Sequence, residues 1–543
     1  MTQNDAQQTE FTVNTQVLVI GAGLSGLASA ETIAEQGYAV LILDQGTRDG
    51  AECCYDPEIG ALYRSLRDRV QEHASISLRS GTKLTHLNGF SGNFQARLEQ
   101  DAGREQLDVG AVVLATGYRC LPLFEQHTLR PGKTVLSIGD LEKLLTDEQG
   151  KARIKNGSGA SIAFLSGFGD EGSPVATERV LKNAMAVQDL EQCQAYVLAG
   201  NVKVGAAGME RLFTRARNQG VTCIKPQDPP ETSLQDDTLH IAYTDPILRQ
   251  DVILNPDCIV LDERIAPDAE NEGLRELLGI DADEKGFLQS GNVHRLPVRT
   301  NREGIFVSGT SAAVKTPDQA LDDAADVALQ VADFLGTGTV QVTGSKAVVD
   351  EGRCVICLTC YRCCPHGAIA WESKKAVISP LACQGCGICA AECPMDAIQL
   401  LEYSDDAMSH AVQEQIKTAE QPSILAFCCQ NSAFEAARTA RKMGLDLPDQ
   451  LRLIEVPCAG KIDVETILRA FTLGAGAVVV LACHEGNCQS ERGNTYAAWR
   501  IRDMQKRLKA LGFDDTRLVF ATLASNMPWE FARIVQETAA RAS

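Results

Sequence analysis

The sequence has little that would tie the chain to a membrane or to nucleic acid. No apolar run among its 543 residues is long enough to span a bilayer. Basic residues are in deficit, with 51 Lys and Arg against 71 Asp and Glu, and the net charge of −20 argues against nucleic acid or anionic lipid as the main partner. The first residues lack the basic and apolar segments of a signal peptide, so we expect a cytoplasmic protein with a disordered leader over residues 1–12.

Cysteine, in contrast, is abundant and unevenly placed. A cytoplasmic chain with 20 cysteines is not a disulfide framework, and because most of them follow residue 350, they predict metal in the C-terminal half. The length predicts three or four domains. The first half alternates strand-like and helix-like segments, which predicts an α/β fold with parallel strands.

An N-terminal strand–turn–helix–strand unit, TQVLVIGAGLSGLASAETIAEQGYAVLILD (15–44), carries a dinucleotide fingerprint. Gly21 suits the tight turn, Gly23 lets the backbone approach a pyrophosphate, and Gly26 lets helix and strand pack closely. The helix N-terminus faces the phosphates with its partial positive charge. Asp44 ends the second strand, where a carboxylate can accept the ribose hydroxyls. We therefore predict a bound dinucleotide.

Two further strand ends favour FAD over NAD as that dinucleotide. They occur in VGAVVLATGYR (109–119) and NREGIFVSGT (301–310). Together with the fingerprint, they resemble the two-dinucleotide-domain flavoproteins over about residues 15–150 and 230–335. That class usually has Asp after its last glycine, where Thr310 stands here. The resemblance implies that further FAD contacts come from Ala115, Thr116, Gly117 and Gly309.

The middle of the first half contains a second GxGxxG, formed by Gly167, Gly169 and Gly172. If this loop binds NAD(P)H, the chain is a free-standing NAD(P)H-dependent flavin oxidoreductase. Asp170 and Glu171 would then lie inside the phosphate cradle and repel the phosphates. The other interpretation is a Rossmann-like layer without nicotinamide, in which case electrons enter or leave through a partner protein.

Residues 354–394 contain the run C-x₂-C-x₂-C-x₃-C-P twice. This is the bacterial dicluster ferredoxin pattern, in which the fourth cysteine of each run binds the other cluster. A zinc ribbon is the competing interpretation, but zinc sites rarely use two triplets that each close with Cys-Pro. Cys363 is left over, and His366 is expected to be a loop residue beside a cluster. The two predicted [4Fe–4S] sites are Cys354, Cys357, Cys360 with Cys393, and Cys383, Cys386, Cys389 with Cys364.

A last group of cysteines follows three short apolar strands, in AFCCQNSAFEAA, VPCAGKID and ACHEGNCQSERGN. Cysteines at the ends of parallel strands converge on one side of the sheet, where ligands usually bind. Five thiols there favour a cluster over inert core cysteines. His484 is open as a ligand, a hydrogen-bond donor to the cluster or a loop residue. The five cysteines are Cys428, Cys429, Cys458, Cys483 and Cys488.

Together these motifs resemble a known assembly. Residues 15–400 resemble the A subunit of heterodisulfide reductase, an FAD protein with ferredoxin clusters. Residues 422–543 resemble the delta subunit of methyl-viologen-reducing hydrogenase through PCAGKID, GAGAVVVLACHEGNC and RGNTYAAWRI. The fusion resembles the B subunit of the quinone-interacting membrane-bound oxidoreductase complex.

The resemblance implies a multidomain α/β fold. A two-dinucleotide-domain, Rossmann-like FAD flavoprotein is joined to an α+β dicluster ferredoxin insert and a C-terminal α/β [2Fe–2S] domain. The expected parts are an FAD-binding domain over 13–150 and 230–340, a second Rossmann-like domain over 151–229, a ferredoxin domain over 345–402 and a delta-subunit-like domain over 422–543.

The resemblance also supplies ligands that spacing alone leaves open. It implies a [2Fe–2S] cluster held by Cys458, Cys483, Cys488 and one of the pair Cys428 and Cys429, with the other as the spare thiol; we take Cys429 as the ligand. The delta family has a further cysteine near the place of Ser432. Lys315 is expected beside the isoalloxazine ring. The vicinal pair Cys53 and Cys54 is poorly spaced for a redox disulfide, so we expect no role for it.

The expected function is electron relay among FAD, two [4Fe–4S] clusters and one [2Fe–2S] cluster, with no acid–base or nucleophilic residues of its own. The implied partners are a hydrogenase or formate dehydrogenase-type donor and either heterodisulfide reductase-like B and C subunits or quinone-interacting membrane subunits. Contact with the inner face of the membrane would come only through those partners. Flavin-based bifurcation is a further option that the resemblance leaves open.

The Pro that follows Cys364 selects this cysteine over Cys363 as the ligand. We expect Cys363→Ala to keep both four-iron electron paramagnetic resonance (EPR) signals of the reduced protein. Cys364→Ala should lose or alter one of the two signals, with a matching fall in iron per chain. Equal damage by the two substitutions would contradict the assignment.

Overall fold

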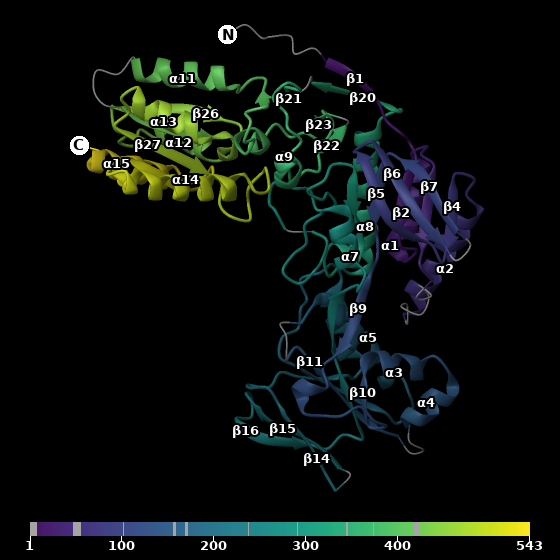
Figure 1. The fold of residues 1–543 in the computed structure, drawn as a ribbon. Coiled ribbons are helices and arrows are strands. Elements are labelled where there is room, and N and C mark those ends of the chain that lie inside the picture. Colours follow the sequence, from purple (N-terminus) through teal and green to yellow (C-terminus); the bar gives the residue numbers. More distant parts are fainter. Residues whose placement is uncertain are drawn as a thin grey trace.

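The computed structural model describes residues 8–46, 56–100, 103–155, 159–168, 172–236, 238–289, 291–343, 346–372, 374–417 and 423–542. Cys53, Cys54 and Gly169 lie outside these residues. Figure 1 shows four bodies, with the two dinucleotide-type domains stacked along one direction and the ferredoxin and C-terminal domains extending to one side of the first. Among the described residues, no helix combines the length and apolarity needed to cross a membrane.

The first domain is built on a parallel sheet of strand order β19-β8-β2-β3-β4. Alternate residues of β2 serve opposite faces. Val17 and Val19 pack on the helical layer, whereas Leu18 and Ile20 pack on an antiparallel sheet. Burial on both faces explains the unbroken apolar run of this strand. The strands are β2 (Val17–Ile20), β3 (Val40–Asp44), β4 (Ile76–Ser80), β8 (Ala111–Leu114) and β19 (Ile305–Val307).

Helices cover one face of this sheet and three antiparallel strands, with one short helix, cover the other. On the helical side, α1 and α8 lie against each other although about 290 residues separate them, and Thr32 Oγ1 donates to the carbonyl of Ala324. The elements are α1 (Leu24–Glu35), α2 (Pro57–Glu72) and α8 (Pro317–Leu335) on one face, and β5 (Lys83–Phe90), β6 (Asn93–Gln100), β7 (Gly103–Val109) and α7 (Asn271–Leu278) on the other.

The second domain repeats this plan with the parallel order β10-β17-β11-β12-β13 and an antiparallel sheet β14-β15-β16. Its segments start earlier and end later than the expected range 151–229, because the edge strand β10 comes from residues 135–137 and its neighbour β17 comes from residues 258–261. The elements are β10 (Val135–Ser137), α3 (Ile138–Leu145), α4 (Glu148–Lys155), β11 (Ser161–Ser166), α5 (Pro174–Gln188), β12 (Gln194–Ala199), α6 (Met209–Asn218), β13 (Thr222–Ile224), β14 (Glu231–Gln235), β15 (Thr238–Asp245), β16 (Gln250–Leu254) and β17 (Cys258–Leu261).

A two-stranded antiparallel ribbon, β9 (Tyr118–Pro122) with β18 (Glu263–Pro267), joins the two domains. At its end, the buried guanidinium of Arg179 on α5 binds the carboxylates of Glu142 at 2.8 Å and Glu263 at 2.6 Å. The same guanidinium donates to Cys120 Sγ at 2.9 Å. Breaking such a buried network leaves charges without partners, so it holds the ribbon firmly on the second domain.

The expected disordered leader does not extend through residue 12. Strand β1 (Gln8–Thr12) pairs antiparallel with β20 (Thr339–Thr343), which follows α8. Val13 N–H then donates to the carbonyl of Gly338 at 2.9 Å. The start of the described chain is therefore tied to the segment that leads into the ferredoxin domain.

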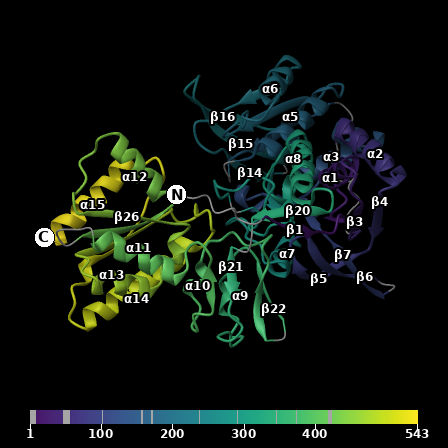
Figure 2. The same cartoon turned by 90° about the horizontal axis from the view of Figure 1, so that it is seen from above.

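The ferredoxin domain consists of two short hairpin-like pairs and two short helices. Strand β21 (Ala347–Val349) pairs with β24 (Ile398–Leu400), and the segment between them forms the repeat. Figure 2 shows this domain between the C-terminal domain and the first domain. Its remaining elements are α9 (Thr359–Cys363), β22 (Ile369–Glu372), β23 (Lys375–Ile378) and α10 (Ile388–Ala391).

The C-terminal domain has a parallel sheet of order β26-β25-β27-β28 between two helical layers. Helix α11 lies between the expected ferredoxin range 345–402 and the expected delta-subunit-like range 422–543, yet Met408 and Val412 are buried in this domain's core, so the helix belongs to it. The elements are α11 (Asp405–Lys417), β25 (Ile424–Cys429), α12 (Ala433–Lys442), β26 (Leu451–Val456), α13 (Val464–Thr472), β27 (Ala477–Ala482), α14 (Gly493–Ala510), β28 (Leu518–Thr522) and α15 (Pro528–Ala542).

Candidate functional site

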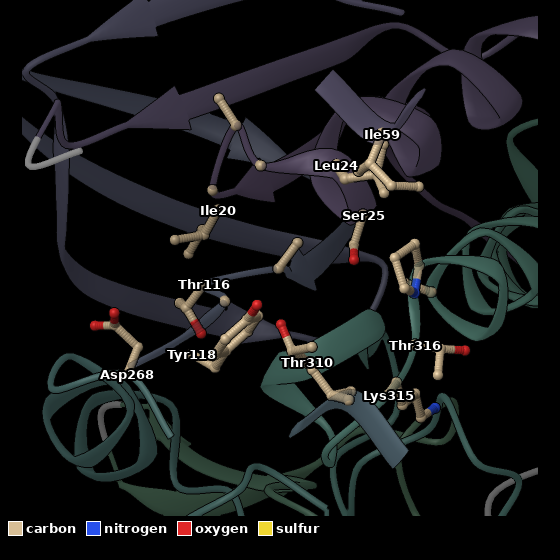
Figure 3. A pocket seen from close by; sticks show the side chains of 18 of the residues that line it. Ile20, Leu24, Ser25, Ile59, Thr116, Tyr118, Asp268, Thr310, Lys315 and Thr316 are labelled. Carbon is tan, nitrogen blue, oxygen red and sulfur yellow. The ribbon is translucent and has the colours of Figure 1, made fainter. Parts of the chain in front are cut away.

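A cavity of about 230 Å³ opens at the carboxyl ends of the first parallel sheet, between β2 and α1. Figure 3 shows Ser25, Thr116, Tyr118 and Thr310 around the same open space, with Lys315 on one side and Asp268 on the opposite side. Gly26 packs behind the turn against Gly21. The predicted residues that line the cavity are Gly21, Gly23, Asp44, Ala115, Thr116, Gly117 and Lys315.

Two glycines of the fingerprint serve different needs. Gly21 has φ of +111°, and a Cβ there would lie 2.2 Å from the carbonyl oxygen of Ala115. Gly23 has an ordinary φ of −73°, and a Cβ there would meet nothing within 4 Å, because it would point into the cavity. Helix α1 starts directly after Gly23 with no side-chain cap, so its first N–H groups are available to an anion. These features fit a dinucleotide pyrophosphate.

A carboxylate from another element, Asp323 of α8, contacts the backbone of the last glycine. The backbone N–H of Gly309 donates to Asp323 Oδ2 at 2.8 Å, and Lys315 forms an ion pair with the same carboxylate. Burial raises the pKa of Asp323, and the Lys315 ammonium opposes that effect. Sequence reasoning missed Asp323, although a carboxylate on the apolar face of α8 was a usable signal.

The second domain also contributes to this cavity, which the sequence did not reveal. Residues Val175, Glu178, Arg179 and Lys182 of α5 form part of its lining. Lys182 forms ion pairs with Asp56 of the first domain and with Glu178. The cavity therefore lies between the two domains, and its charged wall depends on how they are held together.

The eight cysteines of the repeat line two separate cavities. Cys354, Cys357, Cys360 and Cys393, called ring 1, line one of them. Cys364, Cys383, Cys386 and Cys389, called ring 2, line the other. Cys363 lines neither, and its buried thiol donates to the carbonyl of Cys360 at 3.4 Å. Among the described residues, no three Cys, His, Asp or Glu lie close enough to hold a single metal ion.

The surroundings of ring 2 fit a non-protein group. Burial raises the pKa of the Cys386 and Cys389 thiols well above the usual value, so a bound cationic centre is needed for them to be thiolates. His366 also lines this cavity, with Nδ1 at 3.3 Å from the carbonyl oxygen of Asn301. Its buried Nε2 has no hydrogen-bond partner among the described residues, and burial lowers its pKa to about 4. A neutral imidazole thus faces the thiols of ring 2.

Four of the five last cysteines meet at one end of the C-terminal sheet. Cys429 Sγ lies 3.6 Å from Cys483 Sγ, and a Cβ at Gly493 would lie 2.1 Å from Cys458 Sγ and 3.6 Å from Cys488 Sγ. We call Cys429, Cys458, Cys483 and Cys488 the C-terminal thiol set. The hydrogen bonds from Cys429 and Cys488 lower the pKa of Cys483, which favours a thiolate there.

The vicinal pair Cys428 and Cys429 is divided between two environments, because successive strand residues face opposite sides. Cys428 is packed in the apolar layer under α12 and α15, and burial raises its pKa to about 12. Cys429 faces the other thiols. Ser432 is buried beside Cys483. His484 Nδ1 lies 3.1 Å from Thr522 Oγ1, and its Nε2 lies 3.4 Å from Met527 Sδ, so both ring nitrogens have neighbours within the domain.

Ring 2 and the C-terminal thiol set share one buried cluster of side chains. Burial and then the neighbouring Cys458 raise the pKa of Cys386, which shows how near the two groups lie. The first domain reaches this junction too. Asn301 Nδ2 donates to the carbonyl of Pro365 at 2.6 Å, and Asn292 Nδ2 donates to the carbonyl of Cys488 at 2.8 Å.

Comparisons with known proteins agree with this division of the chain. Family models match residues 15–154 as a pyridine nucleotide-disulphide oxidoreductase, 346–394 as a 4Fe-4S dicluster domain, and 424–543 as the delta subunit of methyl-viologen-reducing hydrogenase. The fold and the two rings thus define an oxidoreductase flavoprotein that carries a four-iron ferredoxin domain.

Two individual relatives and one solved structure are similar to larger or separate parts of the chain. The chain is 22% identical to the A subunit of ferredoxin:CoB-CoM heterodisulfide reductase of Methanosarcina mazei, over 92% of the chain and 76% of the relative. Its C-terminal domain is 35% identical to the vhu iron-sulfur D subunit of the F420-non-reducing hydrogenase of Methanocaldococcus jannaschii, over 22% of the chain and 90% of the relative. A solved Lactococcus lactis thioredoxin reductase covers 59% of the chain at 19% identity, with 98% of that structure matched and a TM-score of 0.40.

Over nearly its whole length the chain is thus similar to heterodisulfide reductase A subunits, and its residues 424–543 belong to the delta-subunit family of methyl-viologen-reducing hydrogenase.

The two fingerprint glycines give separable predictions. Gly23→Val should purify with at least about tenfold less flavin per chain, since its side chain fills the space for the ligand, while iron content and far-ultraviolet circular dichroism stay unchanged. Gly21→Ala should lose flavin and also lower the free energy of unfolding by about 1–3 kcal/mol, because a Cβ meets backbone there. Full flavin content in Gly23→Val would contradict the site.

Proposed function

We propose that this chain is the electron-transfer flavo-iron–sulfur subunit of a heterodisulfide reductase-like or quinone-interacting oxidoreductase complex. The observation that carries the proposal is the shared buried cluster of ring 2 and the C-terminal thiol set, with two loops of the first domain against it. Two cofactor-type sites that meet at one junction, with a flavin-type domain in contact with them, suit a relay better than independent activities.

The proposed ligand sets follow the two rings and the C-terminal thiol set. Each ring would hold one [4Fe–4S] cluster, and Cys429, Cys458, Cys483 and Cys488 would hold one [2Fe–2S] cluster. Cys428 is excluded from this set because it faces the opposite layer. FAD would lie in the cavity of the first domain, with Asp44 at its ribose and Lys315 toward the ring system.

When bound, FAD exchanges two electrons and each cluster exchanges one, so the chain converts between two-electron and one-electron transfer. The protein's own residues bind and shield these groups. The α1 N-terminus faces the phosphates, Asp323 holds Lys315 and the Gly309 backbone, and buried apolar side chains exclude water from ring 2.

Contacts in the second domain weigh against NAD(P)H as the direct reductant. The N–H of Gly167, the first glycine of the second fingerprint, donates to Asp262 Oδ2 at 2.7 Å, so a carboxylate stands near the place of a phosphate. The side chain of Ser173 caps α5, and Pro174 supplies no N–H at its first turn. An anionic ligand there would meet a carboxylate and few donors.

The proposed partners bind at opposite ends of the relay. The C-terminal domain would receive a hydrogenase or formate dehydrogenase-type donor, as its relationship to a hydrogenase delta subunit suggests. The remainder would contact heterodisulfide reductase-like B and C subunits or quinone-interacting membrane subunits, which would also provide any attachment to the inner face of the membrane.

Anaerobic preparation tests both cofactor content and the rival function. We expect about ten irons and one FAD per chain, from two four-iron clusters and one two-iron cluster. Mixing with excess NADH or NADPH should leave the flavin absorbance unchanged, whereas dithionite should bleach it. Prompt bleaching by either nucleotide would establish the free-standing oxidoreductase instead, and fewer than about four irons would exclude two filled four-iron clusters.

A further inference from the structure

Rings 1 and 2 differ in how much protein covers them. Cys383, Cys386 and Cys389 of ring 2 are buried between the C-terminal domain and the 365–367 loop. In ring 1, Cys357 is exposed, and Cys354 and Cys393 are partly exposed. Among the described residues, ring 1 is therefore the only one of the two with an exposed cysteine, and a centre held there would be within reach of another protein.

Apolar side chains cover the solvent side of ring 1. Val355, Ile356 and Met395 line the ring 1 cavity, yet they are 58%, 37% and 44% exposed. The three come from both runs of the repeat and meet over the same cavity. Adjacent exposed apolar side chains around a cofactor-type site indicate an interaction surface, because binding is favoured when a partner removes these side chains from water.

An acidic cleft of about 440 Å³ adjoins this apolar cover, and Cys393 lines both. The cleft is lined by residues of α10, α11 and α14 and of the start of α13. Trp499, 57% exposed, stands in its wall. Arg500 is the one cation among the described lining residues, and it pairs with Glu392. Arg353 pairs with Asp396, and Lys461 pairs with Asp405 and Asp463, so the carboxylates exceed these three cations by two. The lining holds five carboxylates in all. These are Glu392, Asp396, Asp405, Asp463 and Glu465.

We propose that Val355, Ile356 and Met395, together with this cleft, form the docking face for a one-electron carrier protein whose contact surface is apolar with Lys or Arg at its rim. The proposal rests on the proposed function, since it assigns ring 1 as the electron port of the relay. One electron crosses the face, so one centre is oxidised by one electron and the other reduced by one, and no bond or proton is exchanged.

Charge selects this occupant over two others. A second copy of the chain would bring a net charge of −20 to an acidic cleft, and an anionic lipid surface would likewise be repelled. A partner with cations at its rim is attracted from a distance, which raises the rate of encounter at low ionic strength.

The test uses the iron- and flavin-loaded full chain, reduced anaerobically, and a basic c-type cytochrome in its ferric form as the probe. Stopped-flow absorbance of the cytochrome gives the bimolecular rate constant over a range of salt concentrations. Glu465→Lys reverses an exposed charge in the cleft. Its matched control is Glu148→Lys, which makes the same change at an exposed first-turn position of α4 in the second domain.

At low ionic strength Glu465→Lys should slow the reaction about tenfold relative to Glu148→Lys, and salt should close that gap. Met395→Glu should slow it at every salt concentration while the ring 1 EPR signal persists.

Equal rates for the two charge reversals would overturn the docking face. A dimer in sedimentation that Glu465→Lys dissociates, or binding to phosphatidylglycerol vesicles, would overturn the proposed occupant. A different measurement decides the proposed function, which would fail if the unchanged chain lacked the expected flavin and iron.

Discussion

The structure depends on one packing contact, in which ring 2 and the C-terminal thiol set lie within a single buried cluster. Thiols of this kind are costly to bury as anions, so each set needs a cationic centre and a dry, closed environment at the same time. The ferredoxin domain and the C-terminal domain enclose ring 2 and the C-terminal thiol set in one such environment, so a single contact serves both sets. The contact brings ring 2 beside the C-terminal thiol set, whereas ring 1 has an exposed cysteine.

A buried lysine makes this contact specific. Lys461, 1% exposed, follows Cys458 by three residues and forms ion pairs with Asp405 and Asp463. Its aliphatic stem lies on the ring 2 loop, where a Cβ at Gly387 would lie 2.7 Å from Lys461 Cβ. A glycine is required there because the two loops pack backbone against side chain. The partners of this lysine come from α11 and the start of α13, so α11 helps to hold the junction and is not a passive connector.

Patterns that are local in sequence were the most predictable. The Gly21–Asp44 unit folds as strand, turn, helix and strand, and the two Cys-Pro runs line two cavities in the crossed grouping that their spacing predicts. Features that depend on residues far apart in the sequence could not be predicted from it. The β10–β17 pairing of the second domain, the Asp323 carboxylate and the α5 wall of the FAD cavity arise from pairings across 100 residues or more, or from a helix face, and no short motif marks them. Once β25 has a register, strand alternation places Cys428 in the opposite layer and Cys429 among the other thiols, which favours Cys429 as the proposed ligand.

The central claim is that the C-terminal thiol set and ring 2 hold neighbouring electron carriers. Low-temperature EPR of the fully reduced, anaerobically loaded chain tests it most directly, because unpaired spins that lie close together broaden and split each other's signals. We expect the two-iron signal to show such coupling, and to become a simple, uncoupled signal in Cys386→Ser, which removes a ring 2 thiol next to Cys458. A two-iron signal that is uncoupled in the unchanged chain would contradict the relay.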